Sequence, residues 1–237
     1  NPFKIKNKSN AKYILKSINI AHEMAYKKKI FGFINCYINK KIVFKSQNIG
    51  VTEYLAKKNK LNQTEIMMIY NKKLSVVPIT THINLKKVAG AITKDLIVKK
   101  VLALKKGYKA LLKTEPKIAI LGLNPHNNEF RSSSEEIKKI IPAIKKLKKL
   151  KCKVLGPLSA DMAFTNNIRK KYNVIIGMYH DQVLVPFKAL YGFNAVNITL
   201  GLKYPRLSPD HGTGKDLVGK NKADFSSLIM AIKFFEK

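Results

Sequence analysis

Short apolar runs rich in β-branched residues alternate with stretches of helical periodicity along most of this 237-residue chain. The run Tyr-Asn-Val-Ile-Ile at 172–176 has the composition of a buried strand, and comparable runs occur at 30–38, 65–70, 74–79 and 117–123. Strands that alternate with helices pack as a sheet covered by helices. The pattern therefore predicts an α/β fold with a mostly parallel sheet.

The helical stretches carry signals for where they begin or bend. Thr52 and Thr93 stand in positions typical of an N-cap, and a helix N-terminus with a hydroxyl can also bind an anion. Pro142 lies inside a helical stretch and is expected to kink or divide it. The expected helices cover 10–29, the residues from Thr52 onward, 85–106, 134–149 and 222–237.

The chain carries a formal net charge of +32, with 46 Lys and Arg residues against 14 Asp and Glu residues. Such a charge suits nucleic-acid binding, which is one alternative function. The lysines, however, are spread along the whole sequence, and they greatly outnumber Arg, the residue that suits bidentate base recognition. We therefore expect no specific nucleic-acid partner and interpret the charge as attracting anionic metabolites.

Cysteine usage and hydropathy predict the compartment. Cys36 and Cys152 lie far apart and form no CxxC pair, which is typical of reduced thiols in a cytoplasmic protein. No apolar run is long enough to span a bilayer, and the first residues lack the apolar core of a signal peptide. We therefore expect a cytoplasmic protein without a membrane partner. Because Asn1 is not an initiator Met, we also expect the gene product to begin further upstream.

Three of the five histidines, His82, His126 and His180, come within a few residues of the end of a predicted strand. Open α/β sheets bind ligands at the carboxyl ends of their strands. Three neutral imidazoles make a good shell for a divalent metal and leave positions for substrate or water. Their spacing matches no short metal motif, so an ordinary core or surface role for each histidine is the alternative.

Cationic and amide side chains follow the last of these histidines at short intervals. Lys188, Asn197 and Arg206 supply the groups that bind a phosphate or a carboxylate. Further on, the loop Asp210-His211-Gly212-Thr213-Gly214 is rich in glycine, which lets backbone amides approach a ligand closely. An ordinary surface turn is the alternative for this loop.

Six short segments occur in a fixed order: Thr81-His82, Leu123-Asn124-Pro125-His126, Gly156-Pro157-Leu158-Ser159-Ala160-Asp161, Met178-Tyr179-His180-Asp181-Gln182, Val196-Asn197-Ile198-Thr199-Leu200-Gly201 and Asp210-His211-Gly212-Thr213. As a set, they resemble segments of the 4-hydroxythreonine-4-phosphate dehydrogenases of pyridoxal phosphate biosynthesis. The resemblance covers essentially the whole chain, and the six segments together are highly specific.

The resemblance implies an α/β fold similar to isocitrate and isopropylmalate dehydrogenases, in which two lobes enclose the active-site cleft. It implies a homodimer whose metal site draws ligands from both subunits. The implied reaction is NAD-dependent oxidation, with decarboxylation, of 4-phosphohydroxy-L-threonine to 3-amino-2-oxopropyl phosphate. A divalent metal such as zinc, magnesium or cobalt would lower the pKa of the substrate hydroxyl, and NAD would accept the hydride.

The matching motifs also imply catalytic roles for particular residues. His82, His126 and His180 match the metal ligands of the family. Asp161 matches an active-site acid, and Lys188 is expected to be catalytic as well as substrate-binding.

The same motifs imply the residues that bind the two organic molecules. Thr52, Lys188, Asn197 and Arg206 match substrate-binding positions. The loop Asp210-His211-Gly212-Thr213 resembles the part that meets NAD in this fold.

The chain departs from the family pattern in two places. Gly50-Val51-Thr52-Glu53 stands where the family has Gly-His-Thr-Glu, so a phosphate-binding imidazole is replaced by an apolar side chain. That keeps a related phosphorylated hydroxy acid, phosphoerythronate-like, as an alternative substrate. The family's N-terminal segment has no counterpart here, so a catalytically inactive fragment is a further alternative. We assign 1–45 and 215–237 to a first lobe lacking its N-terminal part, and 46–214 to a second lobe carrying the metal and substrate residues.

Overall fold

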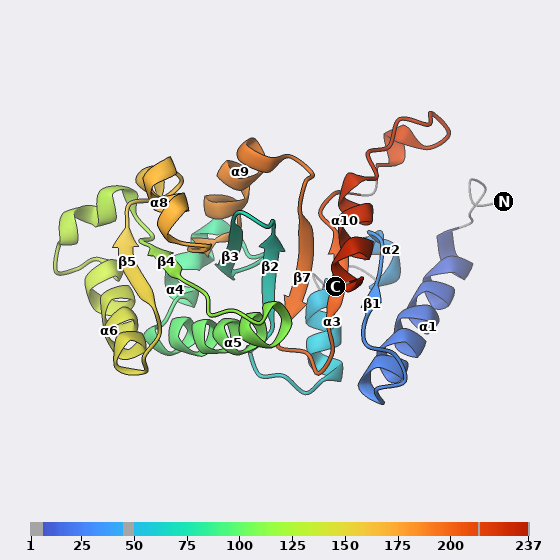
Figure 1. Ribbon diagram of the computed structural model, residues 1–237, viewed down its shortest axis with the longest axis horizontal. Coiled ribbons are helices and arrows are strands. Elements are labelled where there is room, and N and C mark those ends of the chain that lie inside the picture. The colour runs from blue at the N-terminus through green and yellow to red at the C-terminus, as the bar shows by residue number, and fades with distance from the viewer. Residues whose placement is uncertain (1–6, 45–49, 213, 237) are drawn as a thin grey trace.

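The computed structural model describes residues 7–44, 50–212 and 214–236, which form one mixed sheet with helices on both faces (Figure 1). The eight strands of this described part follow the order β1-β8-β7-β2-β3-β6-β4-β5. They are β1 (Phe33–Ile34), β2 (Ile66–Tyr70), β3 (Ser75–Thr80), β4 (Ile118–Leu121), β5 (Val154–Leu158), β6 (Val174–Tyr179), β7 (Val196–Leu200) and β8 (Arg206–Pro209).

Helices occupy most of the segments between these strands. The α-helices are α1 (Asn7–Tyr26), α2 (Lys40–Val43), α3 (Val51–Lys58), α4 (Val88–Ala91), α5 (Lys94–Leu112), α6 (Ile141–Lys149), α7 (Ala160–Ala163), α8 (Asn166–Lys171), α9 (His180–Tyr191) and α10 (Ser226–Phe235). Shorter turns are the 3-10 helices η1 (Leu85–Lys87), η2 (Pro125–Phe130) and η4 (Lys215–Leu217) and the π-helical η3 (Glu136–Ile140). In Figure 1, α1 and β1 lie at one end of the molecule, and β4, β5 and α6 lie at the other.

The predicted α/β architecture is confirmed, but the sheet is less parallel than expected. Four strand pairings are parallel, and three are antiparallel. The turn at 71–73 is too short for a crossover, so β2 and β3 can only pair as a hairpin. The parallel block of β3, β6, β4 and β5 brings the carboxyl ends of its strands to one edge.

Of the two threonines predicted as N-caps, one caps its helix and the other does not. Thr93 is the predicted N-cap of α5, and its hydroxyl accepts the Leu96 N–H at 3.1 Å. Thr52 is not an N-cap: Gly50 takes that position, and Thr52 lies inside the first turn of α3. The Gly50 N–H donates instead to the Glu53 carboxylate at 2.9 Å, so the carboxylate satisfies a backbone donor at the helix start.

Two other predicted elements differ from the expectation. The strand expected at 30–38 is reduced to β1, because only Phe33 and Ile34 find partners on the neighbouring strand β8. The helix expected at 134–149 is not divided at Pro142. The π-helical turn η3 continues directly into α6, and Ile140 and Ile141 at the junction both have right-handed helical backbone angles. Pro142 lies in the first turn of α6, immediately after this change in helix type.

The hydrophobic core lies in two layers, one on each face of the sheet. Along β6, Ile176 belongs to the layer under α5 and α6, and Ile175 belongs to the layer under α9. This alternation follows from the two-residue period of a strand. Phe187 of α9 is fully buried against the second layer and anchors that helix over the site edge.

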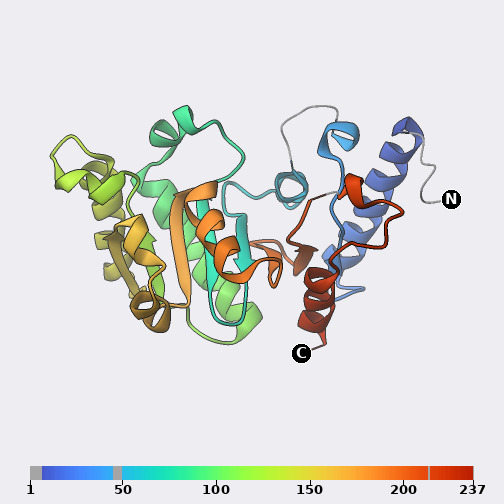
Figure 2. The same cartoon turned by 90° about the horizontal axis from the view of Figure 1, so that it is seen from above.

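A third apolar cluster lies at the β1 end of the sheet, where Leu55 of α3 packs with Phe33 and with Tyr204 from the β7–β8 connection. Figure 2 shows α1 and α10 together at this end of the molecule. β1, from the predicted first lobe, pairs with β8, from the predicted second lobe. The division into lobes at 45/46 and 214/215 stays a prediction.

The described helices include none that is both long and apolar enough to cross a membrane. Cys36 is exposed and Cys152 is buried, and both are free thiols. Burial raises the pKa of the Cys152 thiol, so this sulfur is kept in the unreactive protonated form.

Candidate active site

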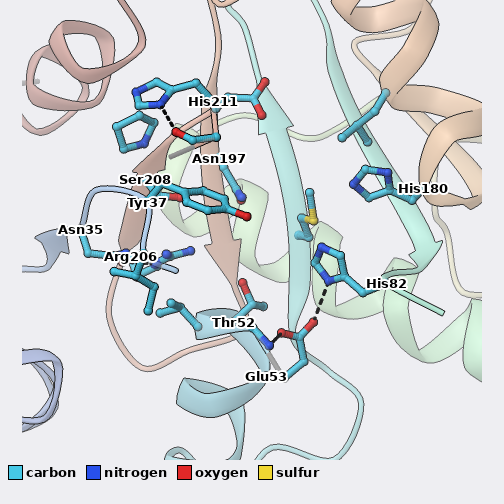
Figure 3. Close-up of a pocket in the computed structure, with 18 of the residues that line it drawn as sticks. Asn35, Tyr37, Thr52, Glu53, His82, His180, Asn197, Arg206, Ser208 and His211 are labelled. Atoms are coloured by element: carbon cyan, nitrogen blue, oxygen red, sulfur yellow. Dashed lines mark hydrogen bonds and ion pairs between the residues drawn. The ribbon is translucent and has the colours of Figure 1, made fainter. Parts of the chain in front are cut away.

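A cavity of about 460 Å³ collects most of the predicted site residues (Figure 3). Its walls come from the segment after β1, the start of α3, the ends of β3 and β6, and strands β7 and β8. Figure 3 shows Arg206, Asn35 and Ser208 on one side and His82 and His180 on the other. The predicted residues that line it are Thr52, His82, His180, Lys188, Asn197, Arg206, Asp210, His211 and Gly212.

His82 and His180 meet because β3 and β6 are adjacent parallel strands with Thr80 level with Tyr179. His180 is the first residue of α9, and His82 lies just beyond β3 with a left-handed φ of 48°. The two imidazole rings lie with their centroids 5.6 Å apart. A left-handed backbone at a non-glycine residue costs about 1–2 kcal/mol and is typical of functional sites.

Both rings have a carboxylate at Nδ1. Asp181 Oδ1 lies 2.7 Å from His180 Nδ1, and Glu53 Oε1 lies 3.5 Å from His82 Nδ1. In metal sites, a carboxylate at one ring nitrogen fixes the tautomer in which the other nitrogen binds the ion. The donor set thus suits a divalent metal at Nε2 of each ring. Within the described residues, however, no third His, Cys, Asp or Glu completes a metal-binding group.

His126 and Asp161 lie away from this cavity. His126 is exposed in η2, where residues 126–130 all have positive φ between 48° and 56°. Asp161 is exposed on α7. These segments follow β4 and β5, the two strands farthest from β1 in the sheet order. One chain therefore brings together two of the three predicted metal ligands and leaves the predicted acid outside.

Glu136 holds the segment that leads to His126. Its carboxylate, fully buried in η3, accepts the backbone N–H groups of Leu123 at 2.8 Å and Asn124 at 2.9 Å. Burial opposes ionisation, but these hydrogen bonds prevail and lower the pKa of Glu136. The left-handed turn is thus fixed at its start by a buried charge.

Arg206 is the most buried cation of the cavity, with 4% of its surface exposed. Its Nε donates to Asn35 Oδ1 at 2.7 Å and its Nη1 to Thr199 Oγ1 at 3.2 Å. Burial lowers the pKa of Arg206 to about 10, while the charge of Glu53 opposes the shift. Arg206 is thus charged at neutral pH, held rigidly, and suited to bind an anion through its remaining donors.

Lys188 lines the cavity, and its ammonium group is paired with a carboxylate. Its Nζ lies 2.6 Å from Asp210 Oδ2 and 4.7 Å from the centroid of the Phe193 ring. Burial raises the pKa of Asp210, against the hydrogen bond and charge of Lys188. Asp210 was predicted to bind NAD as part of the glycine-rich loop, but in this structure its carboxylate pairs with Lys188. Cofactor binding by Asp210 stays a prediction.

Asn197 and Thr52 complete the wall between the cations and the histidines. Asn197 Oδ1 is buried, and no hydrogen-bond partner is present among the described residues. A buried amide oxygen without a partner is costly, which indicates a position for a ligand. The Thr52 hydroxyl lies 3.3 Å from that of Thr199, and Val51 beside it is 6% exposed and packs into the third apolar cluster.

The glycine-rich loop borders the same cavity through His211 and Gly212. A Cβ built at Gly212 would meet no atom within 4 Å, so packing within the described structure does not demand glycine there. Open space above a backbone segment suits the close approach of a cofactor. Thr213 lies outside the described residues.

Several residues of this cavity were not predicted from the sequence, among them Asn35, Glu53 and Ser208. Asn35 and Ser208 carry no local signal, because their places depend on the pairing of β1 with β8 and of β8 with β7. Glu53 does carry a signal, since an acidic residue three positions after Gly50 is typical of a helix start. That signal points to capping and does not reveal the contact with His82.

Comparison with known proteins identifies relatives of this chain. The chain is 45% identical to a 4-hydroxythreonine-4-phosphate dehydrogenase of Aquifex aeolicus (strain VF5), over 90% of the chain and 66% of the relative. It is 44% identical to the enzyme of the same name from Sulfurihydrogenibium sp. (strain YO3AOP1), over 87% of the chain and 64% of the relative. The chain thus spans just under two thirds of the length of these two relatives.

A solved structure and a family profile match this chain to the same family as the two relatives. The crystal structure of 4-hydroxythreonine-4-phosphate dehydrogenase from Klebsiella pneumoniae superposes with a TM-score of 0.81 at 29% identity, covering 94% of this chain and 69% of that one. The predicted isocitrate/isopropylmalate dehydrogenase-like fold class is confirmed by this match. The profile of the pyridoxal phosphate biosynthetic protein PdxA matches residues 2–235. The chain therefore belongs to the PdxA family of pyridoxal phosphate biosynthetic proteins.

Proposed function

We propose that this protein is an NAD-dependent, metal-requiring dehydrogenase that converts 4-phosphohydroxy-L-threonine, with decarboxylation, to 3-amino-2-oxopropyl phosphate in pyridoxal 5'-phosphate biosynthesis. The observation that carries the proposal is one cavity with paired imidazoles on one wall and a buried guanidinium on the other. An acidic phosphorylated substrate needs both walls, because its charged end and its reacting hydroxyl are at different positions. The names of the relatives support the same reaction.

The cationic wall binds the charged end of the substrate. Arg206 has two donors fixed by Asn35 and Thr199, so the guanidinium is oriented before the substrate arrives. Thr52, in the first turn of α3, adds a hydroxyl and the positive end of the helix dipole. The unsatisfied Oδ1 of Asn197 accepts a hydrogen bond from the substrate's hydroxyl or ammonium group.

The opposite wall holds the reacting carbon. His82 and His180 would bind a zinc, magnesium or cobalt ion through Nε2, and the metal supplies Lewis-acid polarisation of the substrate oxygen. The loop carrying His211 and Gly212 borders the cavity and would hold NAD, whose nicotinamide would supply the hydride acceptor. Lys188, which is partly exposed, and the more buried Asp210 form an ion pair in the cavity wall, which suits proton transfer during the reaction.

We also propose a homodimer in which His126 and Asp161 enter the cavity of the partner. The support is their placement: both are exposed, both lie outside the cavity of their own chain, and both follow strands at the same edge of the sheet. The strained left-handed turn at His126 is typical of a segment held for function. A two-fold axis makes such a contribution reciprocal, so each cavity would gain one imidazole and one carboxylate.

The reaction is tested by NADH formation at 340 nm with 4-phosphohydroxy-L-threonine, NAD and added Zn²⁺, Mg²⁺ or Co²⁺. The protein is expected to turn over with at least one metal and to lose turnover with a chelator. A matched assay with 4-phosphoerythronate tests the alternative substrate, which is favoured by Val51 on the cavity wall. Higher kcat/KM with phosphoerythronate would reject the proposed substrate while keeping the reaction class.

Shared sites are tested by mixing two inactive variants, His126→Ala and His180→Ala. In a mixed dimer, one cavity has both defects and the other has none. After random exchange, half of the dimers are mixed, so activity should return to about a quarter of the wild-type value. No recovery, in dimers shown by mass spectrometry to have exchanged subunits, would place all ligands in one chain and reject the shared site.

A further inference from the structure

The two carboxylate oxygens of Glu53 contact different parts of the cavity wall. Oε2 accepts the Gly50 N–H at 2.9 Å and so caps α3. Oε1 lies 3.5 Å from His82 Nδ1 and accepts the Thr81 hydroxyl at 3.4 Å. Figure 3 shows Glu53 at the base of the cavity with its side chain directed at His82.

Capping alone does not explain this arrangement. A capping carboxylate needs one oxygen for the backbone N–H, and its second oxygen ordinarily faces water. Here the side chain is only one-third exposed, and its second oxygen faces the segment that follows β3. The contact joins α3, which carries Thr52, to the segment that carries His82, although β2 and β3 lie between the two in the sequence.

We propose that Glu53 is a positioning residue that fixes the ring and tautomer of His82 so that Nε2 serves as the metal-binding nitrogen. The inference rests on the proposed metal role of His82. The carboxylate is acceptor-only, so a hydrogen bond with it requires the proton on Nδ1 and leaves the Nε2 lone pair to the metal. His82 has a left-handed φ of 48° just beyond β3, and the Glu53 carboxylate lies 3.5 Å from its Nδ1, which places the carboxylate to orient the ring.

The substitution Glu53→Gln separates capping from positioning. Glutamine serves in a capping box as glutamate does, so its oxygen can still accept the Gly50 N–H. Its second group is then an NH₂ donor, which faces His82 Nδ1 and favours the tautomer with the proton on Nε2. That tautomer cannot bind a metal through Nε2. The variant therefore keeps the helix start and weakens the metal site.

The experiment measures Zn²⁺ affinity by competition with a chromophoric chelator, without substrate or NAD. Glu53→Gln is expected to weaken Zn²⁺ binding about 10- to 100-fold, as loss of other carboxylate partners of metal-bound histidines does. In the metal-free protein, the ¹⁵N spectrum of His82 should shift from the Nδ1–H to the Nε2–H tautomer. Thr93→Ala, which removes the N-cap of α5 far from the cavity, is the control for capping. It should lower Tm and leave Zn²⁺ affinity unchanged.

The outcomes separate this inference from the function on which it rests. If His180→Ala leaves Zn²⁺ affinity unchanged, the proposed metal site is wrong. If His180→Ala weakens binding but Glu53→Gln does not, and the His82 tautomer is unchanged, Glu53 is only a cap and the inference is overturned. In a His82→Ala background, Glu53→Gln should have no further effect on Zn²⁺ affinity, because a positioning residue acts through its partner. If Glu53→Gln weakened Zn²⁺ binding in the His82→Ala background as much as in the wild type, the inference would also be overturned.

Discussion

His82 and His180 lie with their ring centroids 5.6 Å apart because parallel strands β3 and β6 end level with each other. The pair is built by register: Thr80 opposes Tyr179, and each histidine follows its strand end directly or within two residues. A shift of either strand would move one ring away from the edge. The metal-binding part of the site therefore depends on the central pairing of the sheet.

Replacing His180 with Ala should abolish tight metal binding without unfolding the protein. The His180 side chain is about one-third exposed at the start of α9, so its loss creates no core cavity. Zn²⁺ affinity and Tm should be measured on the same sample. His211→Ala is the control, since His211 lines the same cavity without belonging to the pair. An equal loss of Zn²⁺ affinity in His180→Ala and His211→Ala would mean that the cavity binds Zn²⁺ through a different set of groups.

Replacing Arg206 with Lys should raise KM for the phosphorylated substrate by about tenfold or more, roughly 1.4 kcal/mol. Lysine keeps the charge but loses the planar group that Asn35 and Thr199 hold. Steady-state kinetics and Tm are the measurements. Arg169→Lys provides a matched control, because Arg169 binds the Phe164 carbonyl outside the cavity. Unchanged kinetics for Arg206→Lys would show that Arg206 only supports the fold.

Replacing Val51 with His should lower KM for 4-phosphohydroxy-L-threonine by less than about tenfold, under ~1.4 kcal/mol. An imidazole adds a hydrogen bond to the phosphate, but Arg206, Lys188 and the start of α3 already supply positive groups. Val51→Leu controls for packing, because Val51 belongs to the third apolar cluster. A much larger gain, with kcat rising too, would indicate that the native cavity is built for another phosphorylated hydroxy acid.

Stability should fall as pH drops below about 6.5, the ordinary pKa of histidine, because of His22. Its Nδ1 hydrogen-bonds the Tyr204 hydroxyl at 2.7 Å in a buried contact. Burial and the charge of Lys58 lower the pKa of His22, while Glu23 opposes them. The unfolded chain therefore binds this proton first, so the stabilisation is complete above pH 6.5 and decreases as pH falls toward the folded-state pKa.

The measurement is the urea midpoint of the wild type and of His22→Asn at pH 8 and pH 5.5. Asn can keep a hydrogen bond near the Nδ1 position but does not titrate. The midpoint of the wild type should fall more between the two pH values than that of the variant. An equal fall of the urea midpoint in the two proteins would assign the pH dependence to other groups.

The sequence by itself determined the chemistry available and the places where elements end. Alternating apolar runs predicted the α/β fold, and β2, β3, β4 and β6 lie at or within the predicted runs. Histidines after strands predicted a ligand edge because the carboxyl ends of strands meet there. These inferences are local, since strand period, turn residues and caps act over a few residues. They place His82 and His180 at the same edge of the sheet, because the two residues follow neighbouring parallel strands.

Only the tertiary structure decided which of these residues meet. His126 follows a predicted strand just as His180 does, yet its segment turns left-handed, with Glu136 bound to the backbone at its start, and stays outside the cavity. Asp210 reaches Lys188, and Glu53 reaches His82, through contacts between elements that are distant in sequence. Strand order and helix docking come from burying apolar faces across the whole chain, and no local pattern encodes them. The sequence thus supplied the side chains of the site, and packing decided their partners.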